Sequence, residues 1–265
     1  FGFFYFNREH RQRFGTWRQL QFERVMFMRM LRFGLPNGFH FFTEVAAFTV
    51  FVLLIGRLGG LAHVAGNIAL SINLIAFMPM IGMGIAASIL VGQCLGRDDA
   101  AEAARYGWTA LRMGLAYIGT IGATFILLPN MYLAIFSAEV SSMDPVALRE
   151  AVRYLLLILA VWGLPDAASL ILSGALKGAG DTHFVMRYQA AVAWGVFVPG
   201  QLVLIVGLQA DHLICWAWAL LYIGLLGGGY TWRFASGKWK RIKLLETKPQ
   251  VRAVPLGTGA DVESL

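Results

Sequence analysis

Long apolar stretches alternate with short polar connections along most of the 265-residue chain. Six of the stretches reach the length of about 20 residues that an α-helix needs to cross a bilayer. We predict membrane spans at residues 35–56, 66–92, 108–129, 153–175, 187–207 and 212–234. The pattern therefore predicts an all-α polytopic membrane protein with six transmembrane helices.

Three of the predicted spans contain an interior proline, namely Pro79, Pro165 and Pro199. Such a proline removes a backbone hydrogen bond and bends the helix. Membrane helices tolerate this where neighbouring groups or water satisfy the freed carbonyl. We therefore expect a bend at each of these positions, and the bend at Pro165 directly precedes Asp166.

Composition agrees with a membrane protein and argues against a soluble one. The chain is 58% hydrophobic and 14% charged, with a mean hydropathy of +0.63, whereas soluble domains have nearer a quarter of their residues charged. The net charge of +7 would suit nucleic-acid binding, but the basic residues cluster at the ends of the apolar stretches. Lipid is the expected partner, and nucleic acid is not.

The basic residues also predict orientation and domain limits. Arginines are frequent in residues 1–33, and such clusters remain on the cytoplasmic side. With six spans, both ends of the chain are then cytoplasmic. We expect a cytoplasmic linker at 1–33, a six-helix membrane unit at 34–243 and a disordered cytoplasmic tail at 244–265. Residues 20–31 either form an interfacial amphipathic helix or extend the first span.

Two acidic residues lie inside the predicted spans. The first span contains FFTEVAAFTVFVLL, in which Glu44 is the only charge, and the fourth contains Asp166. Each lies nine residues from the cytoplasmic end of its span, and at about 1.5 Å per residue both are roughly 13–14 Å deep. The sequence shows no lysine or arginine at that depth. Intramembrane carboxylates without a cationic partner indicate a functional site.

Either the two carboxyl groups are protonated and hydrogen-bonded to helices, or they face a water-filled cavity that binds a cation. Polar neighbours favour the cavity. His40 precedes Glu44 by one helical turn, and Asn73 has a similar depth in the second span. Trp162 lies one turn from Asp166, and the bend at Pro165 frees a carbonyl oxygen. Such oxygens suit a monovalent cation such as sodium, and the same carboxylates could carry a proton.

A competing motif occurs between the fourth and fifth spans. Residues 178–181 read GAGD, which fits the GxGD pattern of intramembrane aspartyl proteases. A glycine-rich turn explains the same residues better, because Asp181 lies in a polar connection and the chain has no Tyr-Asp pair. No motif for a nucleotide, a metal cluster or another cofactor is present. We expect a protein that is not an enzyme and needs no cofactor beyond a coupling ion.

The chain resembles a known family over roughly residues 5–243. The stretches RFGLPNGFHFFTEVAAF, NIALSINLIAFMPMIGMGIAASILVGQCLGRDDAAEAARYG and LILSGALKGAGDT are similar to the second half of multidrug and toxic compound extrusion (MATE) transporters of the NorM-like branch. That family has twelve membrane helices in two six-helix lobes. The resemblance implies the C-terminal lobe of such a transporter, with an N-terminal lobe of the same polypeptide missing.

The resemblance also implies a function and site residues. Family members export cationic and amphipathic drugs in exchange for sodium or protons, here across a bacterial inner membrane. A glutamate and an aspartate of the cation site match Glu44 and Asp166. Trp162 and Asn67 depart from the family, since some relatives have tyrosine and glutamine there. The alternative is a flippase for lipid-linked sugars, whose cavity is expected to carry basic residues.

Overall fold

The computed structural model describes residues 24–56, 60–135 and 145–242. Within these ranges the secondary structure is helical, and six helical stretches are long and apolar enough to cross a membrane. These stretches are Met30–Ile55, His63–Gly96, Ala100–Leu127, Val146–Gly178, Thr182–Gly207 and His212–Ala235. All six predicted spans are therefore confirmed. The N-terminal part of the linker and the C-terminal tail lie outside the described residues.

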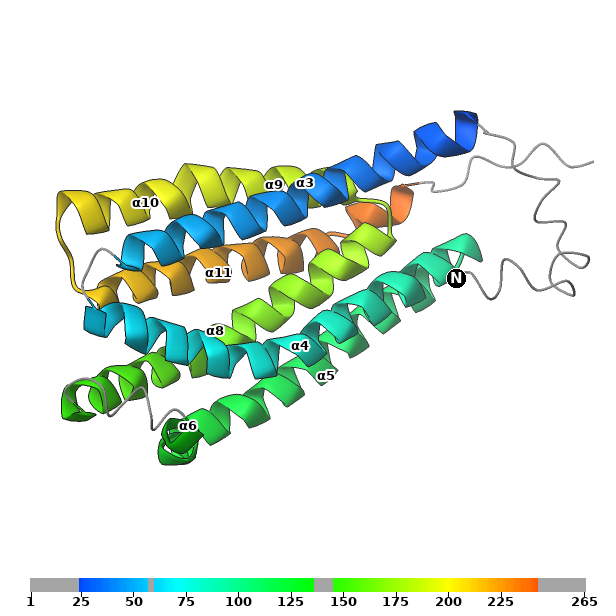
Figure 1. Ribbon diagram of the computed structural model, residues 1–265. Helices are drawn as coiled ribbons and strands as arrows, with labels where there is room; N and C mark the ends of the chain where they lie inside the picture. Colours follow the sequence, from blue (N-terminus) through cyan, green and yellow to red (C-terminus); the bar gives the residue numbers. More distant parts are fainter. Residues whose placement is uncertain (1–23, 57–59, 136–144, 243–265) are drawn as a thin grey trace, which may run out of the picture.

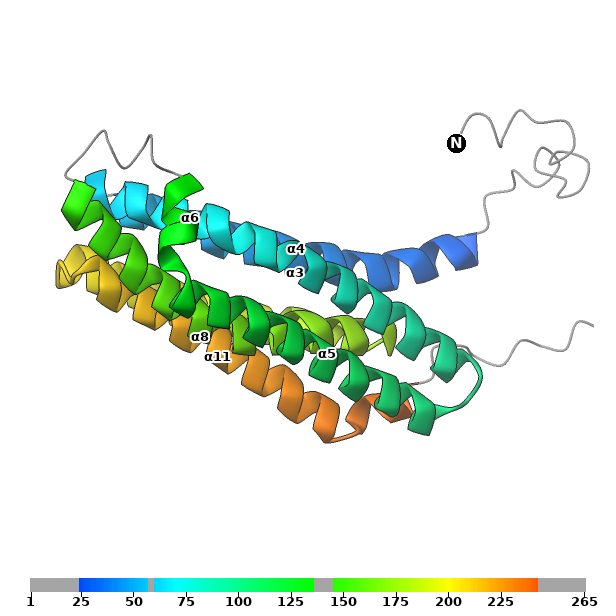
Figure 2. The ribbon, with the colours of Figure 1, turned by 90° about the horizontal axis from the view of Figure 1, so that it is seen from below.

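The helices form two adjoining groups. One group contains α4 (Gly60–Gly96), α5 (Ala100–Leu127) and α8 (Pro145–Gly178), and the other contains α3 (Arg24–Ile55), α9 (Thr182–Val192) and α10 (Val198–Leu202). α11 (His212–Ala235) lies between them, and the short α6 (Pro129–Ile135) follows α5. Figures 1 and 2 show α3 running beside α9 and α10, and α8 running beside α4, α5 and α11.

The first helix is longer than its predicted span. α3 begins at Arg24 and continues without a break to Ile55, with Pro36 inside it. The described part of residues 20–31, from Arg24 onward, is therefore helical and continuous with the first span. Residues 20–23 lie outside the described ranges.

Glycines allow α4 and α8 to approach until their backbones touch. A Cβ atom built at Gly174 would collide with the carbonyl oxygen of Gly84, and one built at Gly178 would collide with that of Ser88. A Cβ atom built at Gly92 would lie 3.2 Å from the carbonyl oxygen of Gly178. Small residues promote this kind of close helix contact in membranes. We call this contact the α4–α8 seam.

The GAGD motif forms the turn between α8 and α9. Gly180 has a φ of +81°, a conformation that glycine adopts without strain. The Asp181 side chain is 7% exposed and accepts a hydrogen bond of 2.7 Å from Nε of Arg233, near the end of α11. The Arg233 guanidinium also lies 4.6 Å from the ring centre of Phe184. Asp181 therefore has a structural ion pair, which agrees with the glycine-turn interpretation of the motif.

The fifth span is not a single regular α-helix. Two π-helical turns, Ala193–Phe197 and Val203–Gly207, flank the short α10. The first turn ends with the Val198 N–H donating to the Ala193 carbonyl, directly before Pro199. A π-helical turn of this kind widens the helix locally. Pro199 therefore lies at a distortion of the fifth span, as its sequence position predicts.

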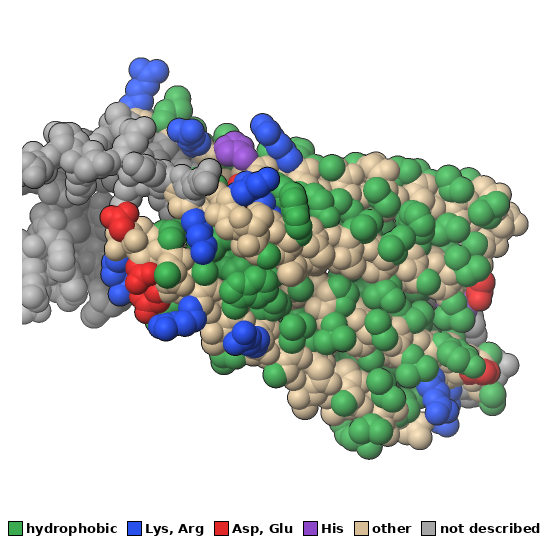
Figure 3. Space-filling view, turned by 180° about the vertical axis from the view of Figure 1, so that it is seen from behind, with side chains coloured by type: hydrophobic (Ala, Val, Ile, Leu, Met, Phe, Trp, Pro, Cys, Tyr) green, Lys and Arg blue, Asp and Glu red, His purple; other side chains and the backbone are tan. Residues whose placement is uncertain are grey.

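The surface separates apolar and charged residues. Figure 3 shows apolar side chains covering much of one face, while lysine and arginine side chains gather mainly toward one end. Exposed large apolar residues include Phe42, Ile75 and Leu127, which are 65%, 71% and 76% exposed. A soluble protein rarely exposes so extensive an apolar surface. The fold therefore defines an integral membrane protein.

Candidate functional site

A cavity of about 250 Å³ lies between α3, α4, α8 and α9. Glu44 is in its wall. Its lining residues are Asn37, His40, Glu44, Ile81, Gly84, Ile85, Ser88, Ile89, Ser169, Leu170, Ser173, Gly174, Lys177 and Gln189. About half of these side chains are polar. The cavity has the mixed lining of a small-ligand or ion site rather than that of an apolar packing gap.

Glu44 opens into this cavity. Its side chain is 40% exposed, and its Oε2 lies 4.0 Å from Nδ1 of the buried His40. The two residues are one turn apart on α3, so the helix places them on the same face, as the sequence predicted. Because Glu44 is reachable from the cavity, a cation in that space would meet its carboxylate directly.

Asp166 lies deeper than Glu44. It is 6% exposed, follows Pro165 inside α8, and its carboxylate interacts electrostatically with Glu44. The carbonyl oxygen of Pro165 faces Gly227 of α11, where a Cβ atom would lie only 2.5 Å away. Asp166 therefore lies on a helix of the other group from Glu44 and is not among the residues that line the cavity.

Lys177 changes the picture obtained from the sequence. The predicted fourth span ends at residue 175 and leaves Lys177 in the connection to the fifth span. In the structure α8 continues to Gly178, and Lys177 lines the cavity together with Glu44. The two opposite charges interact, although among the described residues no ion pair within 4.0 Å joins them. Lys177 is therefore a cavity neighbour of Glu44 that the sequence did not indicate, although it forms no ion pair with it among the described residues.

Sequence reasoning missed a set of buried polar groups beside the acidic pair. Gln189 of α9 donates from Nε2 to the hydroxyl oxygen of Tyr222 at 2.8 Å. The Tyr230 hydroxyl donates to Oε1 of Gln189 at 3.1 Å. Both tyrosines belong to α11. A lone uncharged glutamine in a predicted span was the only sequence signal, and a tyrosine in an apolar helix has no distinctive spacing.

Other predicted neighbours lie elsewhere. Asn67 is at the opposite end of α4, where its amide nitrogen lies 3.2 Å from Nε2 of His63. Together with Phe51 and Trp216, Asn67 borders a hollow of about 10 Å³. Asn73 is half-buried on α4 and is not among the lining residues of the larger cavity. The structure brings neither asparagine into that cavity.

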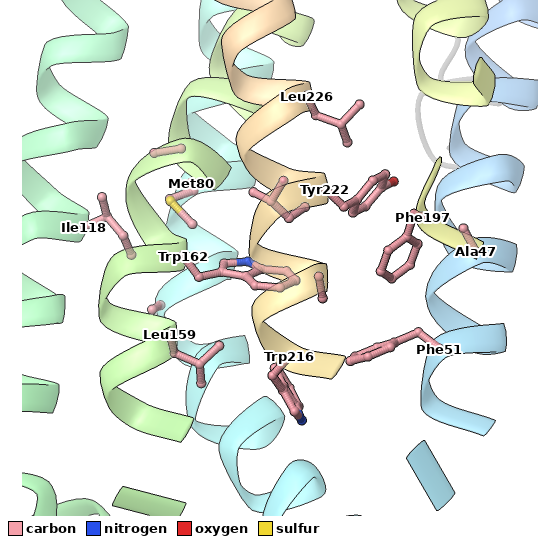
Figure 4. Close-up of a cluster of buried hydrophobic side chains, with 14 of the residues drawn as sticks. Ala47, Phe51, Met80, Ile118, Leu159, Trp162, Phe197, Trp216, Tyr222 and Leu226 are labelled. Atoms are coloured by element: carbon pink, nitrogen blue, oxygen red, sulfur yellow. The ribbon is translucent and has the colours of Figure 1, made fainter. Parts of the chain in front are cut away.

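Trp162 belongs to the cluster of buried hydrophobic side chains shown in Figure 4. It contacts the Asp166 carboxylate through its side chain, and its ring centre is 6.3 Å from that of Trp216. Trp216 meets Phe51 of α3 at 5.3 Å in an edge-on arrangement. Aromatic packing therefore joins α3, α8 and α11 on the side of the acidic pair away from Lys177.

The donor set indicates the kind of ion that fits. Among the described residues, no group of three histidine, cysteine, aspartate or glutamate side chains could hold a metal ion together. Two carboxylates with amide and hydroxyl neighbours instead suit a weakly held hard cation or a proton. Lys177 lies in the same cavity wall as Glu44 and adds a positive charge to this donor set.

Comparison with known proteins identifies the family. The family model described as MatE matches residues 36–203. The probable multidrug resistance protein NorM of Brucella suis is 30% identical over 172 residues, covering 65% of this chain and 36% of that protein. The multidrug resistance protein NorM of Burkholderia vietnamiensis is 29% identical over 214 residues, covering 80% and 42%.

Solved structures show the same fold. A multidrug resistance MATE family transporter of the MOP superfamily, in an outward-facing conformation, matches with a TM-score of 0.71 at 15% identity, over 83% of this chain and 49% of that one. A Pyrococcus furiosus MOP superfamily transporter, described as having a binding pocket of reverse polarity that suggests a different function, matches with a TM-score of 0.65 at 16% identity, over 79% and 45%.

The chain belongs to the MatE family, a family of transporters rather than enzymes. Within that family it is similar to the NorM proteins, and the resemblance found in the sequence is thus confirmed. The chain spans less than half the length of these relatives and solved structures.

Proposed function

We propose that this chain is the C-terminal lobe of a secondary active multidrug exporter, which exchanges cationic or amphipathic drugs for sodium or protons. The observation that carries the proposal is the pair Glu44 and Asp166, two acidic residues in spans of a MatE-family fold, one of them opening into a polar cavity. The names of the relatives, multidrug resistance proteins, support drug as the cargo.

In this proposal the coupling ion binds between α3 and α8. Glu44 binds the ion as it enters from the cavity, and the carboxylate of the buried Asp166 supplies the second negative charge. Lys177 is the competing internal cation, since its ammonium group shares the cavity with Glu44. Ion binding therefore replaces the attraction between Lys177 and Glu44, and ion release restores it.

Exchange requires that ion and drug favour different states of the protein. Glu44 belongs to α3, which packs mainly on α9, whereas Asp166 belongs to α8, which packs mainly on α4, α11 and α5. A cation that both residues hold would draw these two groups together. We infer that drug binds in the state without the cation and is released when the cation enters from outside.

The setting follows from the family and from the charges. The proposed location is a bacterial inner membrane, with the described basic end in the cytoplasm. The proposed partner is an N-terminal six-helix lobe of the same polypeptide, because the relatives are more than twice as long as the matched region. Drugs would bind between the two lobes.

A flippase for lipid-linked sugars is the second candidate, and Lys177 is the observation that favours it. A basic residue in the cavity could bind a diphosphate. Glu44 shares that cavity, however, and a carboxylate opposes an anionic headgroup. A transporter for cationic cargo therefore fits the charges better.

The test is an efflux assay of the intact transporter in membrane vesicles with Glu44→Gln and Asp166→Asn, under separate sodium and proton gradients. Each variant should reach the membrane and lose cation-driven drug efflux by at least tenfold. The exposed Glu150→Gln on α8 is the matched control and should retain efflux. Normal cation-driven efflux by both site variants would show that the proposed site is wrong.

A further inference from the structure

Three buried polar side chains form a directed chain of hydrogen bonds beside the acidic pair. Tyr230 donates its hydroxyl proton to Gln189 at 3.1 Å, and Gln189 in turn donates to the hydroxyl oxygen of Tyr222 at 2.8 Å. The three residues are 0%, 2% and 6% exposed. Side chains buried this deeply in a membrane protein are costly unless their hydrogen bonds are satisfied.

The direction of this chain leaves one proton free at its end. A tyrosine hydroxyl has one proton to donate and two lone pairs that can accept. Gln189 occupies one lone pair of Tyr222, and within the described residues no other hydrogen bond of the Tyr222 hydroxyl is formed. Its proton and its second lone pair are therefore both available in a buried place.

The carboxylates of Glu44 and Asp166 are the charged groups that act on the Tyr222 hydroxyl. Figure 4 shows the Tyr222 side chain pointing from α11 toward α3, where Ala47 lies one turn after Glu44. The ring itself is fixed by stacking on Phe197, with ring centres 4.2 Å apart. Gln189 thus holds the hydroxyl next to the cavity that Gln189 and Glu44 line together.

We propose that Tyr222 is the third oxygen ligand of the cation site, and that Gln189 and Tyr230 are positioning residues that hold its hydroxyl there. This inference rests on the proposed function. Trp162, which contacts Asp166 from its own helix, offers only an N–H donor and cannot supply an oxygen. The phenol from α11 supplies it instead.

The hydroxyl serves the site in both of its states. Without the cation, the free proton of Tyr222 is available to a neighbouring carboxylate and would offset part of its buried charge. With the cation, its second lone pair faces the ion while Gln189 continues to hold the oxygen from the other side. Because Gln189 also lines the cavity, α9 and α11 both take part in a site that the sequence assigned to α3 and α8 alone.

The test measures cation binding rather than transport. The intact, purified transporter is titrated with sodium at constant ionic strength, with choline as the replacement, and its melting temperature is recorded. Tyr222→Phe keeps the stacked ring and removes the oxygen, and should raise the half-maximal sodium concentration about tenfold, the change expected from one lost ligand contact of about 1.4 kcal/mol. Gln189→Leu should raise it by a similar factor.

Tyr132→Phe on α6 is the matched control, because it removes a tyrosine hydroxyl that bonds Thr124 at 2.7 Å and lies on a helix outside the cavity. Its half-maximal sodium concentration should equal that of the unchanged protein. Gln189→Glu should resemble Tyr222→Phe, since the new carboxylate would accept the Tyr222 proton and turn the hydroxyl away. The melting temperature without sodium shows whether each variant is folded.

The same titration separates this inference from the function beneath it. If Glu44→Gln responds to sodium as the unchanged protein does, and the midpoint of stabilisation by acid is also unchanged, the cation site itself is wrong. If Glu44→Gln loses the response while Tyr222→Phe and Gln189→Leu keep it, only the role of Tyr222 is overturned. For a proton-coupled protein the same variants are compared by the pH midpoint of stabilisation.

Discussion

The α4–α8 seam and the cavity beside it share residues but differ in construction. Gly84, Ser88 and Gly174 belong to both. In the seam the backbones of α4 and α8 touch, whereas the cavity is an open space with polar side chains in its wall. α3 crosses the far side of that space and packs chiefly on α9. The seam is therefore the closely packed side of the cavity. Glu44 faces it from α3, a helix that makes few contacts with α4 and α8.

This difference explains how one site can serve two states. Asp166 is fixed in a helix that packs closely against three others, whereas Glu44 is carried by a helix whose position relative to the seam is set largely across a cavity. Interfaces of packed side chains tend to have discrete arrangements rather than continuous ones. A cation between the two carboxylates would favour the arrangement in which α3 is closest to the seam.

Breaking the seam should have the largest effect on stability. Gly174→Ala places a methyl group against the Gly84 carbonyl, and because backbone cannot rotate away, the change should destabilise the protein by about 3 kcal/mol, at the upper end of overpacking effects. Thermal unfolding in detergent measures it. Gly82→Ala, on α4 with open space around the position, should leave stability equal or slightly higher; equal losses in both would contradict the close seam.

Breaking the ion pair that connects the turn after the seam to α11 should have the next largest effect. Arg233→Met leaves the buried Asp181 carboxylate without its partner, and should destabilise by about 2 kcal/mol, somewhat less than a fully buried pair. The exposed Arg187→Met on α9 is the control. If both variants unfold at the temperature of the unchanged protein, the pair has no structural role.

Replacing Lys177, the internal cation of the cavity, should strengthen sodium binding at Glu44. Lys177→Met should lower the half-maximal sodium concentration about fivefold, because a competitor worth about 1 kcal/mol for Glu44 is lost. Sodium titration of the intact transporter measures this, with Arg187→Met as the control of charge. A higher half-maximal concentration would instead mean that Lys177 helps to build the site.

The smallest effect is expected far from the cavity. Asn67→Ala removes an exposed contact with His63 and should change stability by no more than about 0.5 kcal/mol and leave sodium binding unaltered. A tenfold loss of sodium binding in this variant would place the ion site near the opposite end of α4.

Much of the fold could be predicted from the sequence because lipid imposes simple rules. Length and apolarity identify six spans, and the isolated charges Glu44 and Asp166 stand out against them. The start of α5 is equally local, because the Asp99 side chain accepts from the Glu102 N–H at 2.8 Å, as an N-cap does. These features depend on neighbours in sequence.

What the sequence could not provide depends on neighbours in space. Lys177 was placed in a connection because helix ends are uncertain by a few residues, and one extra turn of α8 carries it into the cavity. Gln189 and Tyr222 are 33 residues apart, and nothing in either span indicates that they meet. Arg233 likewise gave no sign that it pairs with Asp181, 52 residues earlier.

The central claim is that Glu44 and Asp166 form one cation site, and a double-mutant cycle on cation binding tests it most directly. Sodium-dependent or acid-dependent stabilisation is measured for Glu44→Gln, Asp166→Asn and the double variant in the intact transporter. If the two carboxylates hold one ion, the double variant should lose no more affinity than the single variant with the larger loss. Losses that add independently would contradict a shared site.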